Sequence, residues 1–405
     1  MEDILFLAHR FPYPPDRGDK IRSWNMLKAL GRLAPVHCCT LVDDPRDLDH
    51  LAAVEAVCAS VHPVAQTRSK LASMAISLVS GQSASVVACG SAPLQAKVDH
   101  ILATCSIGSI FAFSGQMAQF VPSNRRGRRF VMDFVDVDSA KFLSYADQAT
   151  GMAAAANAFE ARRLARFEKA VALQADVSLF VSDAEAKLFR ETTGMGPDRV
   201  RALENGIDLD YFNPQTVLPT VDTGHGPLMV FTGQMDYRPN IDAVAHFVRT
   251  SFPIIRSHLP NARFAIVGRA PTEEVRALSA TQGVLVTGEV ADTRPWLVAA
   301  DVVVAPLLLA RGIQNKILEA MAMARPVVAS PAAAEGIDAT ADDGLHIAID
   351  GRTMAEQVLS LIANPERAAQ FGSAARARMI ARYSWDAQLA GLKDLVTLRP
   401  LEKAA

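Results

Sequence analysis

Residues 312–330 read GIQNKILEAMAMARPVVAS, which predicts an apolar helix followed by a strand that begins at a proline. The helix carries a single carboxylate, Glu319, among Ala, Met and Leu residues. A helix that packs on both faces carries a carboxylate only where that group has a partner. At the helix start, backbone N–H groups, the helix dipole and Lys316 favour an anion such as phosphate. Glu319, one turn further on, can accept two hydroxyls, so the stretch outlines a nucleotide-sugar pocket.

Composition favours an ordinary globular protein with more than one core. The chain has 405 residues, of which 50% are hydrophobic and 21% charged, so two domains are expected. A formal net charge of −2 gives no case for nucleic-acid binding. The five cysteines lack CxxC spacing, which favours reduced thiols over disulfides or a zinc site. No signal peptide or spanning helix is predicted, so we expect a cytoplasmic protein, with peripheral contact at the inner face of the membrane left open.

Short apolar runs alternate with helical segments along the whole chain. The expected strands are 4–8, 36–41, 107–113, 130–135, 177–181, 228–231, 264–267, 284–286, 302–305, 326–329 and 346–349. Continuous apolar strands separated by helices are typical of parallel sheets covered on both faces. The pattern restarts after a Pro- and Gly-rich linker at 214–227. We therefore predict two doubly wound α/β domains facing across a cleft at the carboxyl ends of their strands.

Four sequence motifs occur in the order found in a known family. They are NGID at 205–208, FTG at 231–233, KILEAMA at 316–322 and RPVV at 325–328. Together they resemble the retaining GT-B glycosyltransferases of family 4. In addition, FPYPPDRGDKIRS at 11–23 resembles the N-terminus of sugar transferases associated with PEP-CTERM/exosortase exopolysaccharide systems.

The resemblance implies an architecture and a reaction. It implies a Rossmann-like acceptor domain over 1–213, a Rossmann-like nucleotide-sugar donor domain over 214–383, and a helix at 384–398 that packs back on the first domain. The implied reaction moves a sugar, with retention, from a nucleotide-diphosphate donor to a lipid-linked or saccharide acceptor in cell-surface glycan synthesis. It needs no cofactor and no metal, because GT-B enzymes stabilise the leaving group with helix dipoles and basic side chains. Catalysis then depends on positioning and charge stabilisation.

The resemblance assigns roles to residues of the 312–330 stretch. Glu319 is expected to hold the ribose hydroxyls; the alternative is a salt-bridged surface residue. Lys316 is expected to neutralise the diphosphate, unless it is simply solvated. Gly312, Gln314 and Asn315 belong to the expected donor-binding set.

Arg311 marks a departure from the family pattern. Many relatives have a second glutamate eight positions before the residue equivalent to Glu319, where this chain has Arg311. Arg311 is either a catalytic contact to diphosphate, a contact to a carboxylate on the donor sugar, or a solvated loop residue.

The loop 233–240 follows the first strand of the second domain. Relatives often place an arginine after the glycine and a lysine several residues later, where this chain has Gln234 and Asn240. Gly233 and Gln234 are expected to contact the donor, and Arg238 is the expected substitute for the missing clamp. The alternative is a type I turn around Arg238 without a ligand contact.

The turn after the first strand is expected on the acceptor side. Gly18 allows close backbone approach to a donor phosphate, and the helix that begins near Lys20 offers free N–H groups. Asp16, Asp19 and Lys20 are expected to face acceptor or diphosphate. The alternative is a proline-stiffened turn into an ordinary helix.

Acidic residues lie at the end of a later strand of the first domain. Asp133 and Asp136 are either acceptor-side hydrogen-bonding groups or structural caps. A histidine that relatives often carry nearby is replaced here by the sequence Ser-Gly-Gln at 114–116, and His9 is the alternative. The basic cluster 125–129 and the apolar segment 71–79 are either a lipid-binding pair or a solvated loop and a core helix.

Two other functions stay open at this point. One is a non-catalytic GT-B protein that binds nucleotide sugar within an assembly. The other is a GT-B epimerase or phosphorylase. The products made from labelled donor distinguish them: elongated acceptor, free sugar epimer or sugar phosphate.

Overall fold

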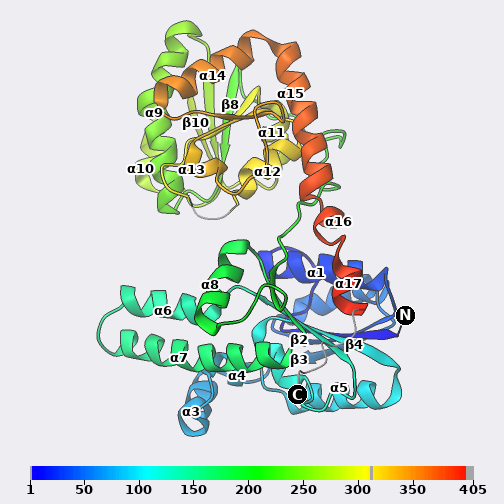
Figure 1. Cartoon of the computed structure of the whole chain (residues 1–405). Helices are drawn as coiled ribbons and strands as arrows, with labels where there is room; N and C mark the ends of the chain where they lie inside the picture. The colour runs from blue at the N-terminus through cyan, green and yellow to red at the C-terminus, as the bar shows by residue number, and fades with distance from the viewer. Residues whose placement is uncertain (1, 311–312, 398–405) are drawn as a thin grey trace. The chain divides into compact units, whose positions relative to one another are not determined.

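The computed structural model describes residues 2–310 and 313–397, which form two compact α/β units (Figure 1). Within the described ranges, residues 2–205 and 388–397 belong to the N-terminal unit, and residues 206–387 belong to the C-terminal unit. These divisions lie a few residues from the boundaries 213/214 and 383/384 expected from the sequence. Each unit contains one parallel sheet, which confirms the predicted pair of Rossmann-like doubly wound domains.

The N-terminal sheet has the strand order β3-β2-β1-β4-β5-β6-β7, and all adjacent strands pair in parallel. Its strands are β1 (Asp3–Ala8), β2 (Val36–Val42), β3 (Ser60–Ala65), β4 (Ile107–Phe113), β5 (Arg129–Val135), β6 (Val177–Phe180) and β7 (Val200–Ala202). The central strands β1, β2 and β4 are almost wholly buried because helices cover both faces. The strand order reverses beside β1, which is where ligands bind in sheets of this class.

Helices connect these strands. They are α1 (Gly18–Gly31), α2 (Leu51–Glu55), α3 (Lys70–Ser80), α4 (Ala84–Ala88), α5 (Ala92–Thr104), α6 (Asp138–Gln148), α7 (Gly151–Gln174) and α8 (Asp183–Thr193), with 3-10 turns η1 (Pro45–His50) and η2 (Gly115–Phe120). The long helix α7 is amphipathic, yet both of its glutamates are buried. Glu160 accepts hydrogen bonds from Ser83 Oγ (2.6 Å) and from the amides of residues 84 and 85, and so caps α4. Glu168 accepts from the Ser139 amide (3.0 Å) at the start of α6, and burial raises its pKa to about 7.

The C-terminal sheet has the order β10-β9-β8-β11-β12-β13, again with parallel neighbours. Its strands are β8 (Leu228–Thr232), β9 (Arg263–Val267), β10 (Val284–Gly288), β11 (Val302–Ala305), β12 (Val327–Ala329) and β13 (Leu345–Ile347). The helical segments are α9 (Arg238–His258), α10 (Glu273–Ala277), η3 (Leu278–Ala280), α11 (Arg294–Ala299), α12 (Asn315–Ala322), α13 (Pro331–Ala334), α14 (Gly351–Ala363), α15 (Pro365–Arg378) and η4 (Met379–Tyr383).

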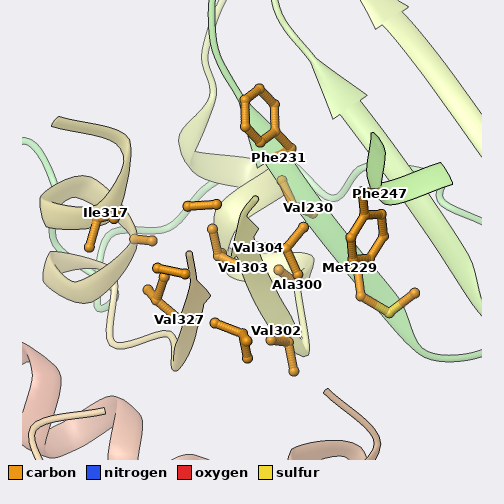
Figure 2. Close-up of a cluster of buried hydrophobic side chains, with 14 of the residues drawn as sticks. Met229, Val230, Phe231, Phe247, Ala300, Val302, Val303, Val304, Ile317 and Val327 are labelled. Atoms are coloured by element: carbon orange, nitrogen blue, oxygen red, sulfur yellow. The ribbon is translucent and has the colours of Figure 1, made fainter. Parts of the chain in front are cut away.

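The core of the C-terminal unit fixes α12 against the sheet. Figure 2 shows Ile317 of α12 beside the strands that carry Val303 and Val327, with Phe247 of α9 against Met229 on the other side. Ile317 and Phe247 are fully buried. Apolar burial contributes about 25 cal/mol per Å², so this packing holds the start of α12 in a fixed register against β11 and β12.

Residues around the division between the units are tied to one unit or the other. Arg376 of α15 donates to the carbonyls of Phe212 (2.7 Å) and Leu209 (3.3 Å), which anchors the segment after residue 206 to the C-terminal unit. Beyond α16 (Trp385–Gln388), the last described helix is α17 (Leu392–Thr397). The Arg129 guanidinium of β5 donates to the Leu395 carbonyl (2.9 Å), so α17 packs on the N-terminal unit. Over the described residues, no helix combines the length and apolarity needed to cross a bilayer.

A buried ion pair joins α1 to β5 in the N-terminal unit. The Arg22 guanidinium donates to both carboxylate oxygens of Asp133 (2.9 and 3.2 Å) and to Asn205 Oδ1 (2.9 Å), and neither charged side chain is exposed. Burial raises the pKa of Asp133, and the Arg22 charge opposes that rise. The pair connects α1, β5 and the last residue before the second unit.

We predict that Arg22→Met destabilises the N-terminal unit by about 3–5 kcal/mol, because it leaves Asp133 buried without its counter-charge. The double variant Arg22→Met/Asp133→Leu should lose less than the sum of the two single changes. Urea unfolding followed by circular dichroism measures the coupling. Additive losses would contradict a direct buried pair.

Candidate functional site

A pocket of about 560 Å³ opens at the carboxyl ends of β8, β9 and β10, against the start of α12. This volume suits a small-molecule ligand. Its lining residues are Thr232, Gly233, Gln234, Tyr237, Asn240, Val267, Gly268, Arg269, Glu289, Val290, Thr293, Ile313, Gln314, Asn315, Lys316 and Glu319. All of them belong to the C-terminal unit. Of the expected donor-binding residues, the structure brings together Gly233, Gln234, Gln314, Asn315, Lys316 and Glu319.

Two glycines bring the ends of β8 and β9 close enough to form the pocket floor. A Cβ on Gly268 would lie 1.7 Å from the Gly233 carbonyl oxygen, a distance that no side chain tolerates. A Cβ on Gly233 would lie 2.8 Å from Asn240 Nδ2 and 3.2 Å from Lys316 Nζ. Gly233 is therefore required for the close approach of its backbone to the two polar side chains behind it.

Lys316 is held rigidly in the wall of the pocket. Its ammonium donates to Asn240 Oδ1 (2.6 Å) and lies 4.2 Å from the centre of the Phe231 ring. Burial lowers the pKa of Lys316 to about 8, although the negative charge of Glu319 opposes that change. The cation is thus fixed in direction, poorly hydrated and still protonated near neutral pH. Such a charge attracts an anion more strongly than a solvated lysine does.

Glu319 faces the same pocket from the next turn of α12. Burial raises the pKa of its carboxyl group to about 7. The Lys316 charge, which makes no direct contact with the carboxylate, opposes this rise only in part. Among residues 2–310 and 313–397, no group donates a hydrogen bond to this carboxylate. A largely buried carboxylate without donors is costly for the fold. The side chain is an acceptor ready for donors that a ligand brings.

An arginine just after β9 lines the pocket. This residue, Arg269, donates to Gln234 Oε1 (3.1 Å). The expected substitute, Arg238, is instead an exposed residue at the start of α9. Its guanidinium pairs with Asp242 and with Glu274 (3.1 Å), and it does not line the described pocket.

Several lining residues were not singled out from the sequence. They include Arg269, Glu289 and Thr293, which follow β9 and β10. The available signal was their position, because both strands were predicted and ligands in parallel sheets bind just beyond strand carboxyl ends. Arg311 and Gly312, two expected contacts, lie outside the described residues.

A charged cluster ties the segment after residue 206 to the rim of this pocket. The Arg294 guanidinium forms an ion pair with Asp292 (2.6 Å) and donates to the Tyr211 carbonyl (2.9 Å). It also lies 3.8 Å from the centre of the Tyr211 ring. Burial and the negative charge of Asp292 raise the pKa of Tyr211, and the charge of Glu319 adds to this effect. Tyr211 therefore lies within electrostatic range of the Glu319 carboxylate.

Two of the N-terminal residues expected on the acceptor side form ion pairs with residues outside the expected set. Lys20 is buried and bonds both oxygens of Asp47 (2.8 Å), with exposed Asp16 at 3.8 Å. The Asp19 carboxylate pairs with Arg10 (2.6 Å). Burial acts to raise the pKa of Asp19, but hydrogen bonds from His9 and Arg10 outweigh burial and hold this pKa below its usual range. Gly18 begins α1, and a Cβ there would meet no atom within 4 Å.

Asp133 within β5 and Asp136 just after it do not converge. Asp133 is fully buried on Arg22, and Asp136, partly exposed, follows it at the end of the strand. No group of three His, Cys, Asp or Glu side chains suited to a metal ion occurs within the described ranges. His9 stacks on Phe113 with 5.9 Å between ring centres, and its buried Nδ1 has no hydrogen-bond partner among the described residues.

The basic cluster 125–129 is largely part of the fold. Arg125 pairs with Asp176 (2.6 Å), Arg128 donates to the Leu102 carbonyl (2.8 Å), and Arg129 holds α17. These three guanidiniums therefore serve internal contacts, which weighs against the lipid-binding alternative for this loop.

Comparisons with known proteins fit the position of the pocket. Residues 226–364 match the family described as "Glycosyl transferases group 1". The chain is 31% identical over 250 residues to an alpha-maltose-1-phosphate synthase of Mycolicibacterium smegmatis, which covers 54% of this chain and 62% of that relative's length. It is 26% identical to a GDP-mannose-dependent monoacylated alpha-(1-6)-phosphatidylinositol monomannoside mannosyltransferase of Corynebacterium glutamicum, covering 57% of this chain and 64% of the relative. The chain thus spans about three fifths of these relatives.

Solved structures share the fold of both units. Anabaena Alr3699/HepE in complex with UDP matches with a TM-score of 0.61 at 16% identity, covering 97% of this chain and 98% of that one. Sucrose-phosphate synthase from Thermosynechococcus elongatus matches with a TM-score of 0.61 at 18% identity, covering 98% of each chain. At these identities the likeness establishes the fold, which is GT-B.

We predict that Glu319→Gln changes stability in a pH-dependent way. The folded-state pKa is raised from 4.5 to about 7, so ionising Glu319 disfavours the folded chain as pH rises between these values. The stability of the variant relative to the parent should therefore increase as the pH rises from 5 to 8, by roughly 1 kcal/mol or more. Thermal midpoints of both proteins at the two pH values test this. A pH-independent difference would show that Glu319 is solvated.

Proposed function

We propose that the chain is a glycosyltransferase that binds a nucleotide-diphosphate sugar in the C-terminal pocket and transfers the sugar to a lipid-linked or saccharide acceptor. We propose further that it is a retaining enzyme of family 4 that acts in exopolysaccharide synthesis of the PEP-CTERM/exosortase type. Its place would be the cytoplasm, at the inner face of the membrane. The N-terminal unit would bind the acceptor.

The unpartnered carboxylate of Glu319 carries the proposal. Two adjacent hydroxyls of a ribose can each donate to one carboxylate oxygen, and charge-assisted hydrogen bonds of this kind contribute about 1.5–3 kcal/mol each. They would also compensate the cost of burying the charge. A neutral apolar ligand would leave the carboxylate as costly as before, so the pocket favours a ligand that is rich in hydroxyls at this point.

The phosphates of the donor would lie at the start of α12. The Lys316 ammonium, the free backbone N–H groups of the first turn and the nearby Arg269 together give a positive end to the pocket. Charge on a diphosphate leaving group grows as the glycosidic bond breaks. A fixed cation in a poorly hydrated site stabilises that charge without reorganisation.

The comparisons support this assignment at the level of the reaction class. The matched family segment, residues 226–364, contains the described pocket residues. The named relatives include a mannosyltransferase that depends on GDP-mannose, and the Anabaena structures contain UDP or UDP-glucose. The motif order in the sequence supports family 4 and retention.

Substitution of the two α12 residues tests the donor site. Glu319→Ala should weaken binding of UDP-glucose or GDP-mannose, whichever binds the parent, by at least about tenfold through loss of the ribose bonds. Lys316→Ala should lower kcat by about 10²–10³-fold. Calorimetry measures the affinity, and turnover of radiolabelled donor measures kcat.

Arg238→Ala is the matched control, because Arg238 is an exposed cation of the same unit paired with Asp242 and Glu274. It should change affinity and turnover less than about threefold, as surface pairs contribute little. An equal loss in all three variants would contradict the site. Release of free epimer or sugar phosphate, or donor binding without turnover, would contradict the transferase.

Donor affinity should depend on pH with a maximum between about 7 and 8. Ribose hydroxyls favour the ionised form of Glu319, so affinity rises as pH passes its pKa of about 7. The diphosphate favours protonated Lys316, so affinity falls above its pKa of about 8. Nucleotide sugars suit the measurement, because their phosphates do not titrate in this range. Glu319→Gln should remove the acidic limb and Lys316→Arg the alkaline limb.

A further inference from the structure

Helix α3 exposes four large apolar residues and buries two of its serines. Leu78 and Val79 are 71% and 92% exposed, and Met74 and Ile76 are also exposed. The inward residues are Ser73 and Ser77, at 2% and 4% exposure. A helix of a globular protein normally has the opposite arrangement. Exposed apolar residues gathered on one element indicate a contact surface.

Polar contacts hold α3 in this orientation. The Arg163 guanidinium of α7 donates to Ser77 Oγ (2.8 Å), to the Ser77 carbonyl (2.7 Å) and to the Gln82 carbonyl (2.9 Å). The same guanidinium stacks 3.7 Å above the Phe159 ring. Gly81, at a φ of +74°, ends the helix in the left-handed conformation. Turning the apolar residues inward would break all these bonds, so the exposed face is a property of the fold.

The surroundings of this face are basic. No aspartate or glutamate occurs between Glu55 and Asp99, a stretch that contains the whole of α3. The acidic residues of α7 are buried in hydrogen bonds, whereas Arg162, Arg166 and Lys169 are exposed along it. Figure 1 shows α3 projecting from the N-terminal unit beside α4 and α7.

We propose that the exposed face of α3 inserts into the interfacial layer of an anionic lipid bilayer, with the basic side of α7 on the headgroups. An amphipathic helix beside uncompensated cations binds bilayers through apolar burial and attraction to anionic lipid together. A protein partner matched to the apolar face alone would not require the basic residues beside it. The inference extends the proposed function, because a lipid-linked acceptor lies in such a surface.

Vesicle sedimentation of the full chain tests the proposal. The parent should bind vesicles of phosphatidylglycerol and phosphatidylcholine, bind pure phosphatidylcholine at least about fivefold more weakly, and lose affinity between 50 and 500 mM salt. Leu78→Asp/Val79→Asp should weaken binding at least about tenfold, because two large apolar side chains no longer enter the lipid. Arg162→Glu/Arg166→Glu should remove the preference for anionic lipid.

Val217→Asp is the matched control, since Val217 is 97% exposed in the C-terminal unit. It should bind vesicles as the parent does, and all variants should keep the thermal midpoint of the parent. Absence of vesicle binding, or equal binding by Leu78→Asp/Val79→Asp, would overturn the proposal. So would a dimer in sedimentation velocity that this double variant dissociates, because a second copy would then cover the face.

The vesicle assay contains neither donor nor acceptor, so its outcome is independent of the proposed reaction. Donor binding by calorimetry uses no lipid. Leu78→Asp/Val79→Asp should bind nucleotide sugar as the parent does, because α3 belongs to the other unit. Loss of vesicle binding with intact donor binding is the expected pattern. Loss of donor binding in the same variant would indicate a folding defect and would overturn the assignment of a lipid-binding role to α3.

Discussion

Parallel pairing of every adjacent strand is the constraint on which the candidate site depends. It places the carboxyl ends of β8, β9 and β10 at one edge, so the residues that follow them meet although they are far apart in sequence. Backbone must approach backbone there, and Gly233 and Gly268 allow it. The start of α12 closes the same edge because its apolar face packs on β11 and β12. A pocket with a positive end at Lys316 and a largely buried carboxylate at Glu319 follows from this arrangement.

Two charged arrangements in the molecule differ in how their charges are compensated. Arg22 and Asp133 satisfy each other through two direct hydrogen bonds with no solvent access, which suits a structural role. Lys316 and Glu319 attract each other without direct contact. Burial lowers the pKa of Lys316 and raises the pKa of Glu319, so the neutral form of each is favoured. The pocket therefore retains an uncompensated electrostatic cost at these two residues. Such a cost is typical of binding sites, where a ligand completes the hydrogen bonds.

Continuous apolar runs predicted the buried strands well, since strands covered on both faces need apolar side chains throughout. The missed strands β3 and β7 lie at the sheet edges, where half-exposed residues and Pro63 interrupt that signal. Among the candidate site residues, Lys316 and Glu319 could be assigned because one helix turn fixes their spacing. Arg269 could not, because its place in the pocket depends on the pairing of β9 with β8. The Arg238–Asp242 pair has i,i+4 spacing within α9 and could have been predicted, whereas Glu274 belongs to α10 and its approach depends on the tertiary fold.

The orientation of α3 is set by a partner that local sequence does not reveal. Serines recur every four residues on one side of the helix, and apolar residues do so on the other side. The periodicity of the sequence is therefore compatible with either side packing on the protein. Arg163, which lies more than eighty positions away in the chain, decides the matter, because a guanidinium in a partly buried site needs acceptors that only the polar face provides. Once those bonds form, the leucine and valine at the end of α3 have no cover within the described unit. Water is then the least favourable surrounding for them, and a lipid interface removes that cost while the cations of α7 stay hydrated at its surface.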